Sequence, residues 1–82
     1  MKASIEMSMY PLGREYVPEI KDFIERVKAH DNIVAEVNGM STQIFGNFRE
    51  MMDVIAREME VSFQKNGKSV FVLKIINAHL QQ

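Results

Sequence analysis

The sequence predicts an α+β fold in which four β-strands and two α-helices follow in the order strand, helix, strand, strand, helix, strand. Two observations support this order. In residues 3–10 and again in residues 33–38, hydrophobic and polar side chains alternate, as in strands with one buried face. In two longer stretches hydrophobic side chains recur every three to four residues, as in amphipathic helices. Because the chain has 82 residues, we expect a single domain over residues 1–82.

The first strand is predicted over residues 3–10, and Pro11 ends it because proline has no N–H to offer the sheet. A helix follows over about residues 16–30, with Pro18 in its first turn, where the missing N–H is not needed. The hydrophobic side of this helix is predicted to consist of Val17, Ile20, Phe23, Ile24 and Val27. Its outer side is predicted to consist of Lys21, Asp22, Glu25, Arg26 and Lys28.

Two short strands are predicted in the middle of the chain. The first covers residues 33–38, and the second covers residues 42–45 and is closed by Gly46. Asn38-Gly39 is a dipeptide typical of tight turns, although the turn could instead span residues 38–41. Either position joins the two strands by a short connection.

A longer helix is predicted next, with Asn47 as its cap and Glu50 in a variant of the capping box. Asn66-Gly67 ends it. The hydrophobic face of this helix is predicted to consist of Phe48, Met51, Met52, Ile55, Met59 and Phe63. The fourth strand covers residues 69–76. This order is the split βαβ pattern of a ferredoxin-like sandwich, in which both helices lie on one face of an antiparallel sheet.

The fourth strand is hydrophobic on both faces, with Val70 and Val72 on one side and Phe71 and Leu73 on the other. A sheet that has helices on one face and water on the other should carry polar side chains on the second face. We therefore expect another copy of the chain to cover that face, in a homodimer or a homotetramer.

Composition and charge exclude several classes of protein. There is no cysteine for a disulfide framework or a thiolate metal site, and the net charge of −1 provides no field that attracts nucleic acid. A charged residue at position 6 argues against a signal peptide, and the longest hydrophobic run, residues 70–73, is too short to cross a bilayer. We expect a cytoplasmic protein without nucleic-acid partners or membrane insertion.

Groups suited to catalysis are sparse. His30 and His79 are predicted at a helix end and near the C-terminus, where each is expected to be a solvated polar residue. Metal ions need clustered ligands, which Asp31 beside His30 does not provide. The glycines fall at predicted turns and caps and form no phosphate-binding loop. We expect no enzymatic activity, no metal and no cofactor.

The polar side chains on the strands are the candidate binding groups. Since the first and third strands are antiparallel neighbours, the end of one lies beside the start of the other. Ser8 and Tyr10 should then meet Ser41, Thr42 and Gln43. The alternative is that these polar residues only mark a solvent-facing side of the sheet.

Three segments of the chain resemble the small thiamine-binding proteins. They are Met7-Ser8-Met9-Tyr10-Pro11-Leu12, Asn38-Gly39-Met40-Ser41-Thr42-Gln43-Ile44-Phe45-Gly46 and Val70-Phe71-Val72-Leu73-Lys74-Ile75. The resemblance implies a ferredoxin-like fold that binds thiamine or its hydroxymethylpyrimidine moiety, for carriage, salvage or transport. Many relatives have Gly-Pro-Met-Gly-Thr where this chain has Met40-Ser41-Thr42, so Ser41 places it with another branch. Some members contain two such domains, which a single-domain chain would match by self-association.

An aminopyrimidine ring needs hydrogen-bond donors and acceptors in its plane and an apolar surface against its face. The ligand-binding residues expected on this basis are Glu6, Ser8, Tyr10, Asn38, Ser41, Thr42, Gln43 and Phe45. Among them, Ser8 and Thr42 would bond the ring nitrogens, Glu6 or Asn38 would accept from the amine, and Tyr10 or Phe45 would stack.

Two other functions compete with this one. A regulatory or structural oligomerisation domain of the same fold would use the polar strand residues at a subunit interface. RNA binding on the sheet would need exposed aromatic side chains and basic flanks, and only Tyr10 and Phe45 qualify.

Overall fold

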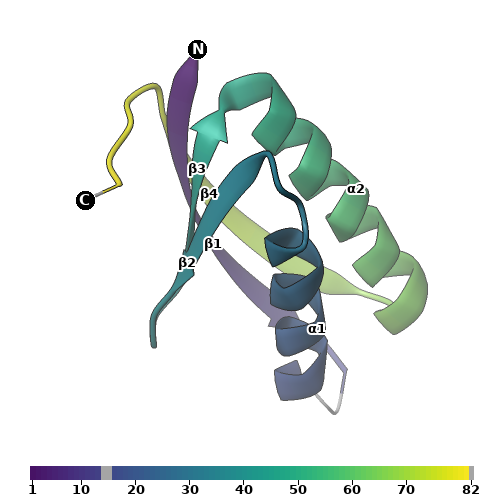
Figure 1. Ribbon diagram of the computed structural model, residues 1–82. Helices are drawn as coiled ribbons and strands as arrows, with labels where there is room; N and C mark the ends of the chain where they lie inside the picture. Colours follow the sequence, from purple (N-terminus) through teal and green to yellow (C-terminus); the bar gives the residue numbers. More distant parts are fainter. Residues whose placement is uncertain (14–15, 82) are drawn as a thin grey trace.

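The predicted order of strands and helices is confirmed in a computed structural model, which describes residues 1–13 and 16–81 (Figure 1). The elements are β1 (Lys2–Pro11), α1 (Tyr16–Lys28), β2 (Ile33–Val37), β3 (Thr42–Asn47), α2 (Phe48–Asn66) and β4 (Ser69–Ile76). The predicted boundaries agree to within about two residues.

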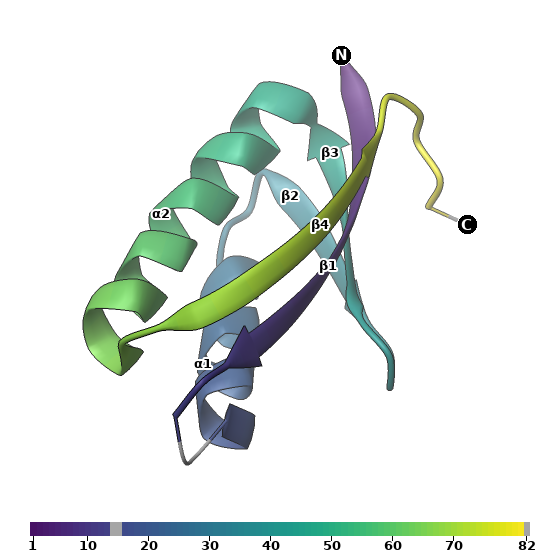
Figure 2. The same ribbon diagram turned by 180° about the vertical axis from the view of Figure 1, so that it is seen from behind.

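The four strands form one antiparallel sheet in the order β2-β3-β1-β4. Both helices lie on one face of this sheet, and the opposite face carries no helix (Figures 1 and 2). This is the ferredoxin-like sandwich that the sequence predicts. It places β1 between β3 and β4, so that its side chains lie at the centre of both faces.

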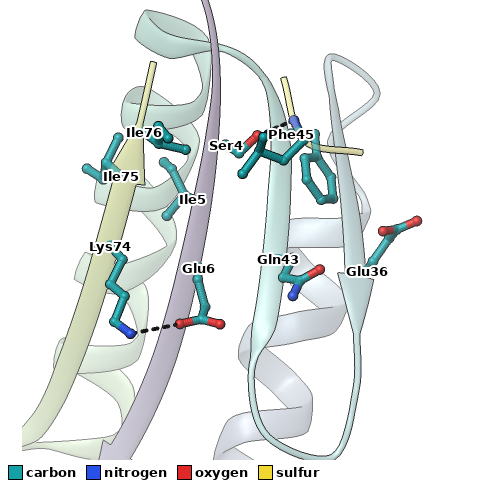
Figure 3. Close-up of a pocket in the computed structure, with 10 residues that line it drawn as sticks. Ser4, Ile5, Glu6, Glu36, Gln43, Phe45, Lys74, Ile75 and Ile76 are labelled. Carbon is teal, nitrogen blue, oxygen red and sulfur yellow. Dashed lines mark hydrogen bonds and ion pairs between the residues drawn. The ribbon is translucent and has the colours of Figure 1, made fainter. Parts of the chain in front are cut away.

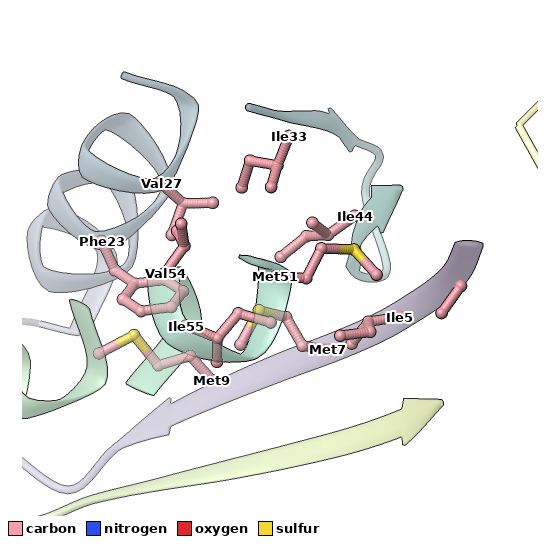
Figure 4. Close-up of a cluster of buried hydrophobic side chains, with 11 residues drawn as sticks. Ile5, Met7, Met9, Phe23, Val27, Ile33, Ile44, Met51, Val54 and Ile55 are labelled. Carbon is pink, nitrogen blue, oxygen red and sulfur yellow. The ribbon is translucent and has the colours of Figure 1, made fainter. Parts of the chain in front are cut away.

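The hydrophobic core fills the space between the sheet and the two helices (Figure 4). The alternating side chains of β1 and β3 supply one side of it, and the helices supply the other because their hydrophobic stripes face the sheet. Its fully buried members include Ile5, Ile44, Phe23, Val27, Met51 and Ile55. Burial of each such side chain contributes about 1.5–3 kcal/mol to folding.

The predicted caps of α2 are confirmed. The Asn47 side chain accepts a hydrogen bond from the Glu50 N–H at 3.3 Å, and Gly67 donates its N–H to the Phe63 carbonyl at 3.1 Å. At Gly67 the φ angle is +79°, a value that favours glycine. The strand β3 continues through Gly46 to the cap itself, so the prediction that Gly46 closes the strand is wrong by one residue.

The buried side of α2 differs from the prediction. Glu58 is only 9% exposed and Ser62 is fully buried, whereas Phe63, predicted to be part of the hydrophobic face, is exposed. Arg26 of α1 was predicted to face outward, but its guanidinium lies between the helices. It donates to Glu58 Oε1 at 2.7 Å, to the Glu58 carbonyl at 2.9 Å and to the Ser62 hydroxyl.

The prediction that His30 is a solvated residue is also wrong. Its Nε2 lies 2.7 Å from Glu58 Oε2, so the Glu58 carboxylate is bonded on both oxygens. Burial acts to raise the pKa of Glu58, but the hydrogen bonds from His30 and Arg26 and their charges outweigh it and lower the pKa. We refer to Arg26, His30, Glu58 and Ser62 as the interhelix network.

The face of the sheet that lacks helices is called the open face here. The strand register places the following side chains on it: Ser4, Glu6, Ser8, Tyr10, Val34, Glu36, Gln43, Phe45, Val70, Val72, Lys74 and Ile76. The C-terminal tail, residues 77–81, crosses one end of this face. There the Ser4 hydroxyl donates to the Ala78 carbonyl at 2.7 Å and accepts from the Leu80 N–H at 2.9 Å.

Candidate functional site

The residues predicted to bind a ligand are divided between two recesses. The first, called the turn recess here, lies where the end of β1, the turn at residues 38–41 and α1 meet, and it has a volume of about 250 Å³. The predicted residues that line it are Ser8, Tyr10, Asn38, Ser41 and Thr42. The second recess, on the open face, is lined by the other three, which are Glu6, Gln43 and Phe45.

Hydrophobic side chains form the walls of the turn recess. Phe23 and Ile24 of α1 and Met7 of β1 line it, together with Val37 at the end of β2 and Met40 in the β2–β3 connection. Phe23 and Met7 belong to the core, so their positions are fixed by packing. Met40, at the tip of the turn, is 90% exposed.

Thr42 is the buried polar residue of the turn recess. It pairs with Met7 on β1 and with Val37 on β2, and since Met7 points into the core, the Thr42 side chain also lies on the helix-covered face. It is 7% exposed, and its side chain is one of those that line the recess. A threonine hydroxyl can both donate and accept a hydrogen bond, so it could bond a polar ring atom of a ligand in the recess.

Ser8 does not share the face of Thr42. It follows Met7 on β1 and pairs with Val72 of β4, so its side chain lies on the open face. Ser8 borders the turn recess, but the two hydroxyls predicted to bond one ring lie on opposite faces of the sheet. Tyr10, at the end of β1, is exposed at the edge of the recess.

Asn38 builds the turn. Its Oδ1 accepts hydrogen bonds from the Met40 N–H at 2.8 Å and the Ser41 N–H at 3.0 Å, and its own N–H donates to the Ser41 carbonyl at 3.1 Å. The turn therefore spans residues 38–41, the second of the two predicted positions. Because the Asn38 oxygen is engaged in the turn, it is not the free acceptor for an amine that the sequence suggested.

The recess on the open face is larger, about 640 Å³ (Figure 3). Glu6 lies at its centre, 3.6 Å from Lys74 Nζ on β4, and its other oxygen accepts from the Ser41 hydroxyl at 3.3 Å. Gln43 is the cross-strand neighbour of both Glu6 and Glu36, so the three side chains form one row across the sheet.

Phe45 lies at the edge of this second recess, beneath the C-terminal tail. Its side chain is only 4% exposed, and the His79 ring packs edge-on against it with 6.0 Å between ring centroids. In this arrangement little of the Phe45 ring, which was predicted to stack on a ligand, is accessible.

The described residues offer little for metal binding or membrane insertion. Between residues 1–13 and 16–81, no three His, Asp or Glu side chains come together in a group that could hold a metal ion. Over the same ranges, neither helix has both the length and the apolar character needed to cross a bilayer.

Solved structures share this fold over nearly the whole chain. A Streptococcus pneumoniae protein is 24% identical with a TM-score of 0.87, and the match covers 98% of this chain and 90% of that one. A hypothetical protein from Methanocaldococcus is 25% identical with a TM-score of 0.81, covering 99% and 84%. A Thermotoga maritima protein that carries the provisional name of a thiamine biosynthesis/salvage protein is 22% identical with a TM-score of 0.82, covering 92% and 82%.

No curated protein matches the chain in sequence. The family model described as "Thiamine-binding protein", however, matches residues 5–78, which cover most of β1 and every later element through β4. This match confirms the resemblance seen in the three sequence segments. The chain therefore belongs to the thiamine-binding protein family.

Proposed function

We propose that this protein binds thiamine, or its hydroxymethylpyrimidine moiety, without chemical turnover and holds the pyrimidine ring in the turn recess. Membership of the thiamine-binding family supports the ligand class, and so does the name of the Thermotoga maritima relative. The observation that carries the choice of site is Thr42, a nearly buried residue whose side chain brings a hydroxyl to a recess with mainly apolar walls. A ligand in the recess would be within reach of that hydroxyl for a hydrogen bond.

The dimensions of the turn recess suit one ring. Its volume of about 250 Å³ is below the range of about 300–1,000 Å³ that is usual for drug-sized ligands. In our proposal the flat pyrimidine lies between Phe23 and Met7 and is hydrogen-bonded by Thr42, with Asn38 and Ser41 at its rim. The thiazolium ring of thiamine would lie at the mouth, where the exposed Tyr10 ring could stabilise its positive charge.

Thermal unfolding with and without ligand tests this function. Thiamine and hydroxymethylpyrimidine should each raise the melting temperature, because a ligand at 100 times its dissociation constant adds about 2.7 kcal/mol of stability. A pyrimidine that lacks the exocyclic amine serves as the control and should give a smaller rise. If neither ligand at millimolar concentration shifts the transition, thiamine binding is excluded as the function.

The open face suggests that the protein also self-associates, as a homodimer or a homotetramer. Val70, Val72 and Ile76 form a row of side chains on the open face of β4 that are 46%, 49% and 47% exposed, with Lys74 between Val72 and Ile76. A second copy packed on this row would remove it from water. The same exposed row also favours the competing function, in which the protein is an oligomerisation domain that binds no ligand.

Sedimentation at micromolar concentration should show a species larger than the monomer. Val72→Lys should convert it to a monomer, because the substitution places a charge in the buried interface. Val61→Lys, on the exposed side of α2, is the matched control and should leave the assembly unchanged. A wild-type protein that sediments as a monomer would contradict self-association.

A further inference from the structure

We propose that Glu6 is a positioning residue of the turn recess, which it shapes from the opposite face of the sheet by holding Ser41. The inference rests on the proposed function, since it concerns the same ligand site. Glu6 lines the recess on the open face and is not among the residues that line the turn recess. A contact effect of Glu6 on a ligand in the turn recess would therefore have to pass through another residue.

The pairing of β1 with β3 explains why the turn needs such a contact. The last pair in the ladder is Met7 with Thr42, so the residues from 41 back to 38 have no ladder partner on β1. The hydrogen bonds made by Asn38 lie within the turn, where they fix its shape but not its position. The 3.3 Å bond from the Ser41 hydroxyl to Glu6 Oε2 ties the turn to β1 (the row that contains Glu6 is drawn in Figure 3).

Glu6 is itself held on the other side. Its Oε1 lies 3.6 Å from Lys74 Nζ, so the carboxylate lies between β4 and the turn. The turn at residues 38–41 contains Asn38 and Met40, which form the outer wall of the turn recess. Loss of the Ser41–Glu6 bond would free this wall to move away from α1. Ligand binding would then have to order the turn, which lowers the affinity.

A double-mutant cycle tests the link by ligand affinity. Glu6→Ala and Ser41→Ala should each weaken thiamine binding about fivefold, the loss expected for one hydrogen bond of about 1 kcal/mol. The double variant should be no weaker than either single variant, because both remove the same bond. Ser41→Thr keeps the hydroxyl and should restore wild-type affinity. Glu36→Ala is the matched control, since it removes a carboxylate from the same row without touching the turn.

A measurement without ligand separates this inference from the proposed function. Amide hydrogen exchange of the Met40 and Ser41 N–H groups should become about fivefold faster in Glu6→Ala and stay unchanged in Glu36→Ala. If the wild type fails to bind thiamine and hydroxymethylpyrimidine, the proposed function is wrong, while the exchange rates still decide whether Glu6 holds the turn. If Glu6→Ala matches Glu36→Ala in exchange, or in affinity where the wild type binds, Glu6 has no positioning role.

Discussion

Replacing Arg26 with methionine should lower the free energy of unfolding by about 3 kcal/mol. The change leaves the Glu58 carboxylate buried with His30 as its remaining partner and deprives the Ser62 hydroxyl of its donor. Breaking a buried ion pair from one side typically costs about 3–5 kcal/mol, and the partial exposure of Arg26 places this case at the low end. Urea unfolding, extrapolated linearly to water, measures the loss.

Arg57→Met is the matched control for this prediction. Arg57 also pairs with a carboxylate, that of Asp53 at 3.0 Å, but the two side chains are 63% and 68% exposed. Exposed pairs of this kind contribute about 0.2–1 kcal/mol, so the control should lose little stability. Equal losses in the two variants would show that burial of the interhelix network has no energetic consequence.

The pH dependence of stability provides a second readout of the same variant. Because the pKa of Glu58 is lowered in the folded protein, its contribution is complete above the ordinary glutamate pKa of about 4.3. This stability is lost as the pH falls through the lowered folded-state pKa. In Arg26→Met the acid-induced loss should be smaller than in the wild type, since part of the cause of the lowered pKa is gone. If the loss of stability in acid is the same in Arg26→Met and the wild type, Arg26 is not a cause of the lowered Glu58 pKa.

Replacing Thr42 with valine should weaken the binding of hydroxymethylpyrimidine by about 10- to 100-fold. The substitution keeps the shape of the side chain but removes the hydroxyl, so a ring atom that it would bond is left buried and unsatisfied, at a cost of about 1–3 kcal/mol. The fold should lose little stability, because valine has the branched shape of threonine and lies among the apolar walls of the recess. Calorimetric titration gives the affinity, and urea unfolding gives the stability.

Two further variants make the Thr42 result specific. Thr42→Ser keeps the hydroxyl and should retain most of the affinity. Ser8→Ala removes a hydroxyl that lies on the open face, so it should also bind nearly as well as the wild type. Wild-type affinity in Thr42→Val would place the ligand outside the turn recess.

The fold could be predicted from the sequence because each element has its own local pattern. The alternation in residues 3–10 and the Asn47 cap of α2 depend on neighbours a few residues away, and both are found as expected. The exposed hydrophobic side of β4 was also visible, since Val70 and Val72 stand on the side away from Phe71.

The binding site was only partly predictable, because it depends on the register between β1 and β3. Strand order correctly brings the end of β1 beside Thr42. The face on which each side chain lies follows from the pairing of Met7 with Thr42, and a shift of one residue would reverse it. No local pattern specifies that register, which is why Ser8 and Thr42 were expected on one face.

The interhelix network was missed, although the sequence contains an indication of it. Glu58 and Ser62 continue the stripe of Met51 and Ile55 at helical spacing, so two polar side chains lie within a hydrophobic face. Polar residues in such positions need partners. The partner, Arg26, is on the other helix, and only the packing of α1 against α2 shows that it turns inward.

The position of β1 at the centre of the sheet has a consequence for how the chain reaches its folded state. One neighbour, β3, follows β1 within a few dozen residues. The other neighbour, β4, is much farther along the sequence, and its Ile76 pairs with Ser4 of β1. On a ribosome, β1 must therefore wait until β4 has been synthesised and has left the exit tunnel before its second edge is filled. Pairing over such a long loop is entropically slow, and the exposed edge of β1 could meanwhile pair with another nascent chain.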